Sequence, residues 1–292
     1  MLLLDTILLR PYVFVFLAIY LVGCSLHLGL KRALLFGVAG YLVAWLSELS
    51  SIHNGFPYGH YYYLDGTTGK EIWVLGVPLM DSISYVFLVY ASYSLALLVF
   101  SPLCRSRCMV YVLETKKIRD SLQVRILSAL LFVYLDIIID PVALRGDRWF
   151  LGRIYGYPEQ GVYFGVPLSN FLGWFAVGFS MIYVLQKIDQ FLRRKGATDL
   201  VGYKYPWRFL IGPVLYFCVL VFNLSVTFFI HERMLGWAGI FILLLPAFLM
   251  YAIMRDKLSR ESVETAVAEH YRDFPQAMTK TDALSYSSLT KE

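Results

Sequence analysis

Long apolar runs separated by shorter polar stretches are the main pattern of this 292-residue chain. Seven runs come close to the 20 or so residues that a helix needs to cross about 30 Å of hydrocarbon. They lie at residues 12–30, 33–52, 77–100, 121–140, 162–186, 207–230 and 236–254. A membrane β-barrel would show short alternating segments instead. The pattern therefore predicts an all-α, polytopic membrane protein with about seven transmembrane helices.

Both ends of the chain fit this assignment. The apolar stretch from Met1 to Gly23 contains Asp5 and Pro11 and lacks a small-residue cleavage pattern, so we predict a retained first span. The end of the chain is rich in Ser, Thr, Glu and Lys. We predict a transmembrane domain at 1–258 and a polar tail at 259–292, partly helical near Val263–His270 and unstructured after Pro275.

Composition and charge fix the orientation. Hydrophobic residues make up 58% of the chain and charged residues 16%, against about 25% charged residues in soluble domains. Fifteen Lys and Arg residues flank the spans on one side and six on the other; the six are Arg10, Lys70, Arg145, Arg148, Arg153 and Arg233. The positive-inside rule then predicts a cell-membrane protein with its N-terminus outside and its C-terminus in the cytoplasm. The net charge of +5 follows from these loops and indicates contact with membrane lipids rather than nucleic acid.

A four-residue motif occurs twice. Gly76-Val77-Pro78-Leu79 is repeated as Gly165-Val166-Pro167-Leu168. Each copy follows a loop rich in Tyr and Gly, and each is followed at equal spacing by a polar residue and an aromatic one: Asp81 and Tyr85, then Asn170 and Trp174. Helices 2–3 and helices 4–5 are therefore predicted to form an internal parallel repeat, and a site between the copies is expected.

Four acids lie within or just inside the predicted spans: Glu48, Asp81, Asp136 and Asp140. An ionised acid at mid-helix costs about 2.5–3.5 kcal/mol on insertion scales. Asp136 and Asp140 share a helix face because they are four residues apart. Glu48 and Asp81 lie near the same outer helix ends, so all four could converge on one cavity. The alternative for each acid is exposure at the interface or pairing with Arg145, Arg148 or Arg153.

The neighbouring aromatic residues suggest a chemistry. Carboxyl groups in apolar surroundings can stay protonated and act as acids, and aromatic faces stabilise cations. Such a cavity suits protonation of an alkene to a carbocation, with Asn170 or a second carboxylate orienting a water molecule. The candidate binding residues are Tyr58, His60, Tyr61, Tyr85, Tyr163, Asn170 and Trp174, and no cofactor motif is found.

The motifs resemble those of the carotenoid biosynthesis membrane-protein family. The resemblance rests on Glu48, on Gly55-Phe56-Pro57-Tyr58-Gly59, on the first repeat motif, and above all on the run from Asp140-Pro141 to Trp174. It covers residues 40–180 well and the remaining helices only by hydropathy. It implies hydration of the terminal double bond of an acyclic carotenoid to a tertiary alcohol without a cofactor. Glu48, Asp140 and Asn170 match characteristic polar positions of the family; Asp140 or Asp136 is the expected proton donor, with Glu48 and Asp81 as partners.

Two other functions stay open. An intramembrane prenyltransferase could bind Mg²⁺ and diphosphate at Asp136 and Asp140, although the sequence shows no second Asp-rich motif on the matching side. A carotenoid- or lipid-binding or transport protein without chemistry could also carry intramembrane acids and repeats. The five scattered histidines and four cysteines suggest neither a metal site nor a disulfide framework. The oligomeric state is not predicted.

Overall fold

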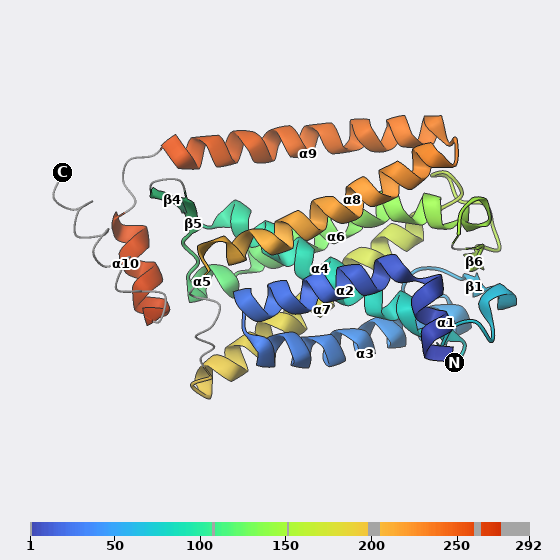
Figure 1. Cartoon of the computed structure of the whole chain (residues 1–292), viewed down its shortest axis with the longest axis horizontal. Coiled ribbons are helices and arrows are strands. Elements are labelled where there is room, and N and C mark those ends of the chain that lie inside the picture. The colour runs from blue at the N-terminus through green and yellow to red at the C-terminus, as the bar shows by residue number, and fades with distance from the viewer. Residues whose placement is uncertain (1, 107–108, 151, 198–204, 260–263, 276–292) are drawn as a thin grey trace.

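The computed structural model is a bundle of long apolar helices that run side by side (Figure 1). It describes residues 2–106, 109–150, 152–197, 205–259 and 264–275. The main helices are α1 (Leu2–Leu9), α2 (Pro11–His27), α3 (Leu30–Asn54), α4 (Leu79–Phe100), α6 (Leu122–Ala143), α7 (Leu168–Arg194), α8 (Ile211–Phe229) and α9 (Arg233–Ser259). Six helices in the described parts are long and apolar enough to cross a membrane, and α1 with α2 can form a seventh, bent span. The predicted polytopic all-α fold is confirmed.

Shorter elements close the two ends of the bundle. At one end lie the paired strands β1 (Tyr62–Tyr63) and β6 (Tyr155–Gly156), and β2 (Trp73–Val74) pairs with β3 (Val77–Pro78). At the other end lie the hairpin β4 (Leu103–Ser106) and β5 (Met109–Val112), α5 (Lys116–Arg119) and α10 (Glu264–Asp273). Three 3-10 turns cover Asp65–Thr67, Gly146–Arg148 and Pro206–Leu210. The tail predicted to be unstructured after Pro275 lies outside the described residues.

The ends of several spans differ from those predicted. The apolar stretch from Met1 to Gly23, predicted as part of one span, is broken at Arg10, where α1 and α2 meet at 90°. Pro11 begins α2, because a missing N–H costs nothing in a first helical turn. Helix α7 begins at Leu168 rather than at residue 162. The segment before it is a tight turn, in which the amide of Tyr163 donates to the Val166 carbonyl at 3.2 Å.

The two copies of the repeated motif have the same local backbone. Leu75 and Phe164 have φ values of 50° and 49°, and the glycines that follow, Gly76 and Gly165, have φ values of 83° and 96°. Glycine adopts this left-handed conformation without steric cost. In each copy the proline is extended and lies one position before the helix rather than inside its first turn. Repetition of the whole helix pairs stays a prediction.

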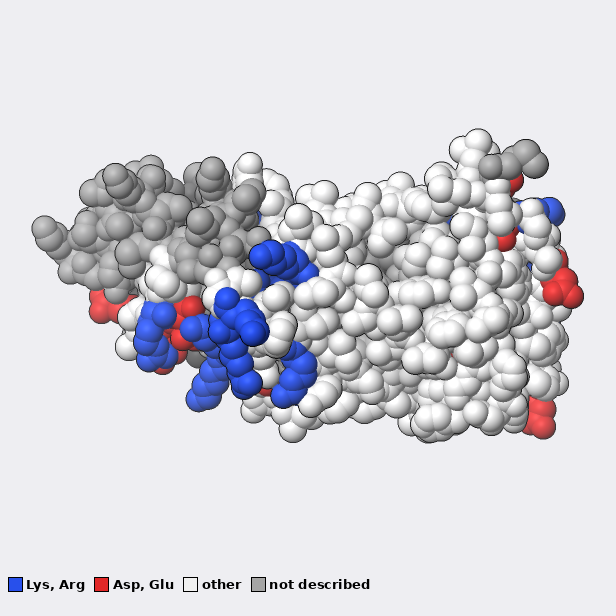
Figure 2. Space-filling model, turned by 90° about the horizontal axis from the view of Figure 1, so that it is seen from below, with Lys and Arg blue, Asp and Glu red and all other residues white. Residues whose placement is uncertain are grey.

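Helix α4 lies at the centre of the bundle. It contacts α2, α3, α6 and α8, and most of its residues are buried. Helix α9 packs mainly on α8 and leaves large apolar side chains exposed, as a lipid-facing helix does. The face in Figure 2 has a broad middle part without charged side chains, and most of its Lys and Arg gather toward one end. This distribution fits a helix bundle embedded in a bilayer.

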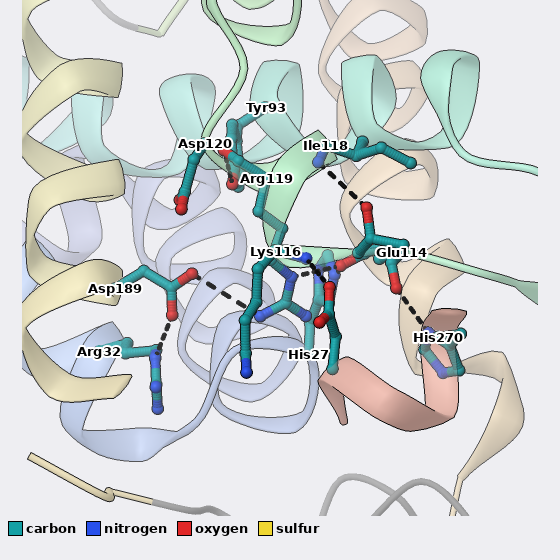
Figure 3. Close-up of polar contacts among 12 residues, drawn as sticks. His27, Arg32, Tyr93, Glu114, Lys116, Ile118, Arg119, Asp120, Asp189 and His270 are labelled. Atoms are coloured by element: carbon teal, nitrogen blue, oxygen red, sulfur yellow. Dashed lines mark hydrogen bonds and ion pairs between the residues drawn. The ribbon is translucent and has the colours of Figure 1, made fainter. Parts of the chain in front are cut away.

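Buried ion pairs tie the helices together at the end that carries α10 (Figure 3). Arg32 of α3 contacts Asp189 of α7 at 2.6 Å. Glu114, in the connection between β5 and α5, contacts Arg119 at 2.6 Å and His27 of α2 at 2.7 Å. Burial alone would raise the pKa of the Glu114 carboxyl, but His27 and Arg119 outweigh burial and hold this pKa well below its ordinary value.

Helix α10 covers this charged cluster. The imidazole of His270 contacts the Glu114 carbonyl at 2.6 Å, and the Phe274 ring lies 4.5 Å from the Arg119 guanidinium. The Asp273 carboxylate accepts from the amide of Lys116 at 2.8 Å. The part of the tail that the structure describes is therefore docked on the bundle rather than solvated throughout.

Close packing of α7 on the loop after α3 yields a first prediction. A Cβ atom at Gly173 would lie 2.6 Å from the Tyr58 ring and 2.7 Å from the Pro57 carbonyl, whereas one at Gly37 of α3 would meet only the Tyr20 hydroxyl, at 3.9 Å. Both glycines are helical, so alanine gains about 1 kcal/mol of helix propensity at each. At Gly173, overpacking of about 1–3 kcal/mol opposes this gain. We expect Gly173→Ala to lower the melting temperature in detergent micelles and Gly37→Ala to maintain or raise it; an equal increase for both would contradict the packing.

Candidate functional site

A cavity of about 140 Å³ lies inside the bundle, at the end that carries β1 and β6. Side chains from α2, α3, α4, α6, α7 and α8 line it, together with residues of the two Tyr-rich loops. Nine of the residues proposed from sequence meet there: Glu48, Tyr58, Tyr61, Asp81, Tyr85, Asp136, Asp140, Asn170 and Trp174. The four intramembrane acids therefore share one cavity.

Asp136 and Asp140 share one hydrogen-bond donor, the side-chain amide of Asn170. They lie one helical turn apart on α6 and both are buried. The Asn170 side-chain amide, from the first turn of α7, donates to the Asp136 carboxyl at 2.7 Å and to the Asp140 carboxyl at 3.1 Å. The other Asp136 oxygen, Oδ1, has no hydrogen-bond partner among the described residues. This oxygen can therefore bond to a molecule that enters the cavity.

Two tyrosines from the loop before α7 hold Asp140. Tyr155 donates to its Oδ1 atom, and Tyr157 donates to Oδ2 at 2.7 Å. Burial, together with the nearby Asp140 charge, raises the pKa of both phenols well above the ordinary value. Both hydroxyls consequently keep their protons and stay donors over the physiological pH range. Asp140 thus receives three hydrogen bonds, two from tyrosines and one from Asn170.

The pairing of β1 with β6 brings the two Tyr-rich loops together. Tyr63 is opposite Tyr155 and Tyr62 is opposite Gly156. Side chains alternate along an extended strand, so Tyr61 and Tyr63 line the cavity while Tyr62 is 43% exposed. The ring centroids of Tyr61 and Tyr157 are 6.4 Å apart. The loops together form an aromatic cover over the outer end of the cavity.

Glu48 has only neutral hydrogen-bond partners. It lies on α3 and is 3% exposed. One carboxyl oxygen accepts from the Ser82 hydroxyl, in the first turn of α4, and the other accepts from Tyr63 at 3.2 Å. Burial and the nearby Glu48 raise the pKa of Tyr63 well above the ordinary value of a phenol, so Tyr63 also stays a donor.

Asp81 is in a different electrostatic environment. Arg10 contacts Asp81 at 2.6 Å and Glu71 at 2.8 Å. The guanidinium is buried at the break between α1 and α2 and is held by these two acids. Two of the three arginine partners considered from sequence, Arg145 and Arg148, contact Glu232 instead of the four acids.

Aromatic rings form the inner wall of the cavity. Tyr85 and Trp174, which follow the two repeated motifs at equal spacing, stack with centroids 4.7 Å apart and an interplanar angle of 22°. Phe132 packs against Trp174 at 4.5 Å. The Tyr58 hydroxyl contacts the Ser47 hydroxyl at 2.8 Å, and its ring lies 6.3 Å from that of Tyr85. Tyr85, Trp174 and Tyr58 all line the cavity, so aromatic side chains lie beside the acids.

Two proposed binding residues do not line the cavity. His60 is exposed and lies beside Gly55 at the end of α3. The Tyr163 ring packs on Phe164 and Phe171, at 5.0 and 5.8 Å. Their positions in Tyr-rich loops suggested the cavity, but both loops turn these side chains away from it.

Sequence reasoning missed several lining residues. They are Arg10, Tyr12, Tyr63, Trp149, Tyr155, Tyr157 and Asn223, together with Ser82, which holds Glu48. The Tyr-x-Tyr spacing of Tyr61 with Tyr63 and of Tyr155 with Tyr157 was a usable signal, because alternate residues of an extended segment share a face. No local pattern indicates Arg10 or Asn223, which reach the cavity from distant helices.

Comparison with known proteins gives one family and one relative. The family model described as "Carotenoid biosynthesis protein" matches residues 6–245. A bisanhydrobacterioruberin hydratase of Haloarcula japonica is 30% identical over 180 residues, which cover 60% of this chain and 53% of that protein. The chain thus spans about half the length of this curated relative. No solved structure matches the chain.

The tyrosine contacts to Asp140 yield a second prediction. Tyr157→Phe removes a half-buried donor to a carboxylate, and hydrogen bonds to charged groups contribute about 1.5–3 kcal/mol. We expect a lower melting temperature in detergent micelles. Tyr62→Phe, in the opposite loop but facing outward, is the matched control and should leave the melting temperature unchanged. Equal effects of the two substitutions would show that the Tyr157 hydroxyl contributes nothing through Asp140.

Proposed function

The chain belongs to the carotenoid biosynthesis protein family, and from this premise we propose that it hydrates the terminal double bond of an acyclic carotenoid to a tertiary alcohol. The observation that carries the proposal is the buried trio Glu48, Asp136 and Asp140, which faces aromatic rings and has only neutral hydrogen-bond partners. The name of the Haloarcula relative, a hydratase, supports the same reaction class.

The first step is protonation of the alkene. Two carboxyl groups that share one amide resist double ionisation, so the Asp136–Asp140 pair holds one proton. Three donors contact Asp140 and favour its ionised form, whereas Asp136 accepts a single bond. We therefore assign the proton to Asp136. Its unpartnered Oδ1 delivers the proton to the alkene carbon that bears hydrogen, and the π bond breaks to leave a tertiary cation on the carbon with two methyl groups.

The rings stabilise this cation. The stacked pair of Tyr85 and Trp174 and the ring of Tyr61 line the same cavity as the acids. A cation over an aromatic face gains about 2 kcal/mol or more where water is excluded. The new Asp136 carboxylate adds electrostatic stabilisation without a covalent bond to the substrate.

Water then adds to the cation. Its oxygen forms a bond to the cationic carbon, and the surplus proton passes to Glu48, which Ser82 and Tyr63 hold in place. The product is a tertiary alcohol. Transfer of this proton from Glu48 back to Asp136 through water in the cavity restores the starting state, so the reaction consumes one water and no cofactor takes part. Asp81 balances the charge of Arg10 rather than acting as a base.

The alternatives have less support. The Asp140 oxygens already accept from Tyr155, Tyr157 and Asn170, which competes with the metal–diphosphate role that a prenyltransferase would need. The 90° break between α1 and α2 at the cavity-lining Arg10 does favour a carrier, since broken helices are typical of transporter sites. A carrier, however, would leave its carotenoid chemically unchanged.

The substrate and the orientation follow from the same proposal. An acyclic carotenoid dissolves in the bilayer and reaches the site from there. The end with most Lys and Arg would face the cytoplasm, which puts the cavity near the outer face of the cell membrane. Residues 1–258 form the membrane domain and 259–292 the cytoplasmic tail.

The third prediction concerns the acids. In a host that accumulates lycopene, the wild-type chain should yield a pigment heavier by one water. General-acid catalysis contributes about 100- to 10,000-fold, so Asp136→Asn should lower the hydration rate by this factor, and Asp140→Asn should also impair it. Asp120→Asn is the control, because Asp120 pairs with Arg193 at the opposite end of the bundle.

Pigment mass spectrometry, normalised to the amount of folded protein, gives the readout. Full activity of Asp136→Asn with loss in Asp140→Asn would move the donor role to Asp140. Full activity of both variants would refute the carboxyl-pair mechanism. Unchanged lycopene with well-folded wild-type protein would exclude hydration of this substrate and favour a carrier.

A further inference from the structure

An apolar groove of about 570 Å³ runs between α2 and α8 on the lipid-facing surface of the bundle. Val15 contributes from α2, and Val214, Phe217, Cys218 and Val221 contribute from α8. All five side chains are exposed in the isolated protein. The lining carries almost no polar surface, so the groove suits a hydrocarbon chain rather than a polar headgroup.

The groove lies next to the cavity that holds the acids. Tyr12 and Phe16 line both of them. On the groove side Phe222 stacks on Tyr12, with centroids 5.0 Å apart, and meets Phe16 edge-on at 5.9 Å. The next residue, Asn223, lines the cavity. The groove and the cavity therefore meet at a cluster of three aromatic rings.

The size of the cavity requires such an extension. A cavity of about 150 Å³ holds a molecule as small as benzene, and the cavity with the acids measures about 140 Å³. It can take the reactive end of a carotenoid but not the long polyene attached to that end. The rest of the chain must lie elsewhere, on a surface that is apolar and joined to the cavity.

We propose that the groove between α2 and α8 binds the polyene chain of the substrate next to its reactive end, which passes the rings of Tyr12, Phe16 and Phe222 to reach the acids. This proposal rests on the proposed function. The occupant is the substrate and not a resident lipid acyl chain, because Tyr12 and Phe16 line both the groove and the cavity where the proposed reaction takes place. Tyr12, Phe16 and Phe222 then fix how deeply the end of the chain enters.

A matched pair of substitutions on α2 tests the groove. Val15 and Val22 are both 56% exposed, but only Val15 lines the groove. We expect Val15→Trp to raise KM for lycopene about tenfold or more with kcat little changed, because groove contacts bind the substrate and transition state alike. Val22→Trp should behave as wild type. A short acyclic alkene with a single reactive end, which fits the cavity alone, should react equally with both variants.

If the wild type is active, three outcomes decide whether the groove binds the polyene chain. Equal KM values of Val15→Trp and Val22→Trp for lycopene would overturn the proposal and assign the groove to lipid. If Val15→Trp also lost activity on the short substrate, its effect would lie in the catalytic cavity, and this result would contradict the groove proposal as well. Reduced activity of Val15→Trp on lycopene, with unchanged activity on the short substrate, would support the proposal.

If the wild type hydrates no substrate, a binding assay can still test whether the groove binds the polyene chain. Cys218 is exposed in the groove, so lycopene added to lipid-containing micelles should slow its alkylation by an apolar maleimide about tenfold, measured by mass spectrometry of the Cys218 peptide. Protection in wild type and in Val22→Trp, but not in Val15→Trp, would support the groove even though the proposed hydration had failed. No added protection in the wild type would overturn the groove.

Discussion

A carboxylate buried among apolar helices must have a partner, and the kind of partner divides the acids of this bundle in two. Within the described residues, six acids are buried. Glu71, Glu114 and Asp189 each contact an arginine, and such pairs hold helices together at the cost of desolvation. Glu48, Asp136 and Asp140 have only hydroxyl and amide donors. An acid with a cationic partner loses its proton at lower pH and stays ionised, because the positive charge stabilises the carboxylate. An acid with neutral partners can hold and release a proton.

This division also separates the two ends of the molecule. The charged cluster with Glu114 and Asp189 joins α2, α3, α5 and α7 at the basic end and is covered by α10 (Figure 3). The acids with neutral partners lie at the other end, beneath the loops paired by β1 and β6. This pairing involves only two residues from each loop, and it brings Tyr63 to Glu48 and Tyr155 to Asp140. Charged pairs therefore join the helices at one end, and neutral donors hold the acids at the other.

The sequence predicted the parts of this arrangement that depend on local spacing. Apolar length gave the spans, and the four-residue separation of Asp136 and Asp140 gave their common face. The repeated motif indicated that Tyr85 and Trp174 are equivalent, and in the structure these two rings stack on each other. The partner of Asp81 could not be predicted, because Arg10 is 71 residues away and reaches it only through the break after α1. The sequence could not show that His60 and Tyr163 lie outside the cavity lining, because loop composition gives no direction for a side chain, which turn geometry decides.

The proposed reaction needs a cavity that both an apolar substrate and water can reach. Its organic substrate is soluble only in hydrocarbon, while its other reactant is water. A site at the bilayer centre would lack water, and a site in the aqueous loops would lack the substrate. In the proposed orientation both can arrive: α2 and α8 offer an apolar groove beside the cavity, and the Tyr-rich loops line the cavity at the end of the bundle that carries β1 and β6. Acids with neutral partners can exist at this depth because hydroxyl and amide groups, which carry no net charge, donate to every one of their carboxyl oxygens except Asp136 Oδ1. Replacement of these donors by arginine would stabilise the carboxylates and, by the same interaction, remove the acid on which the chemistry depends.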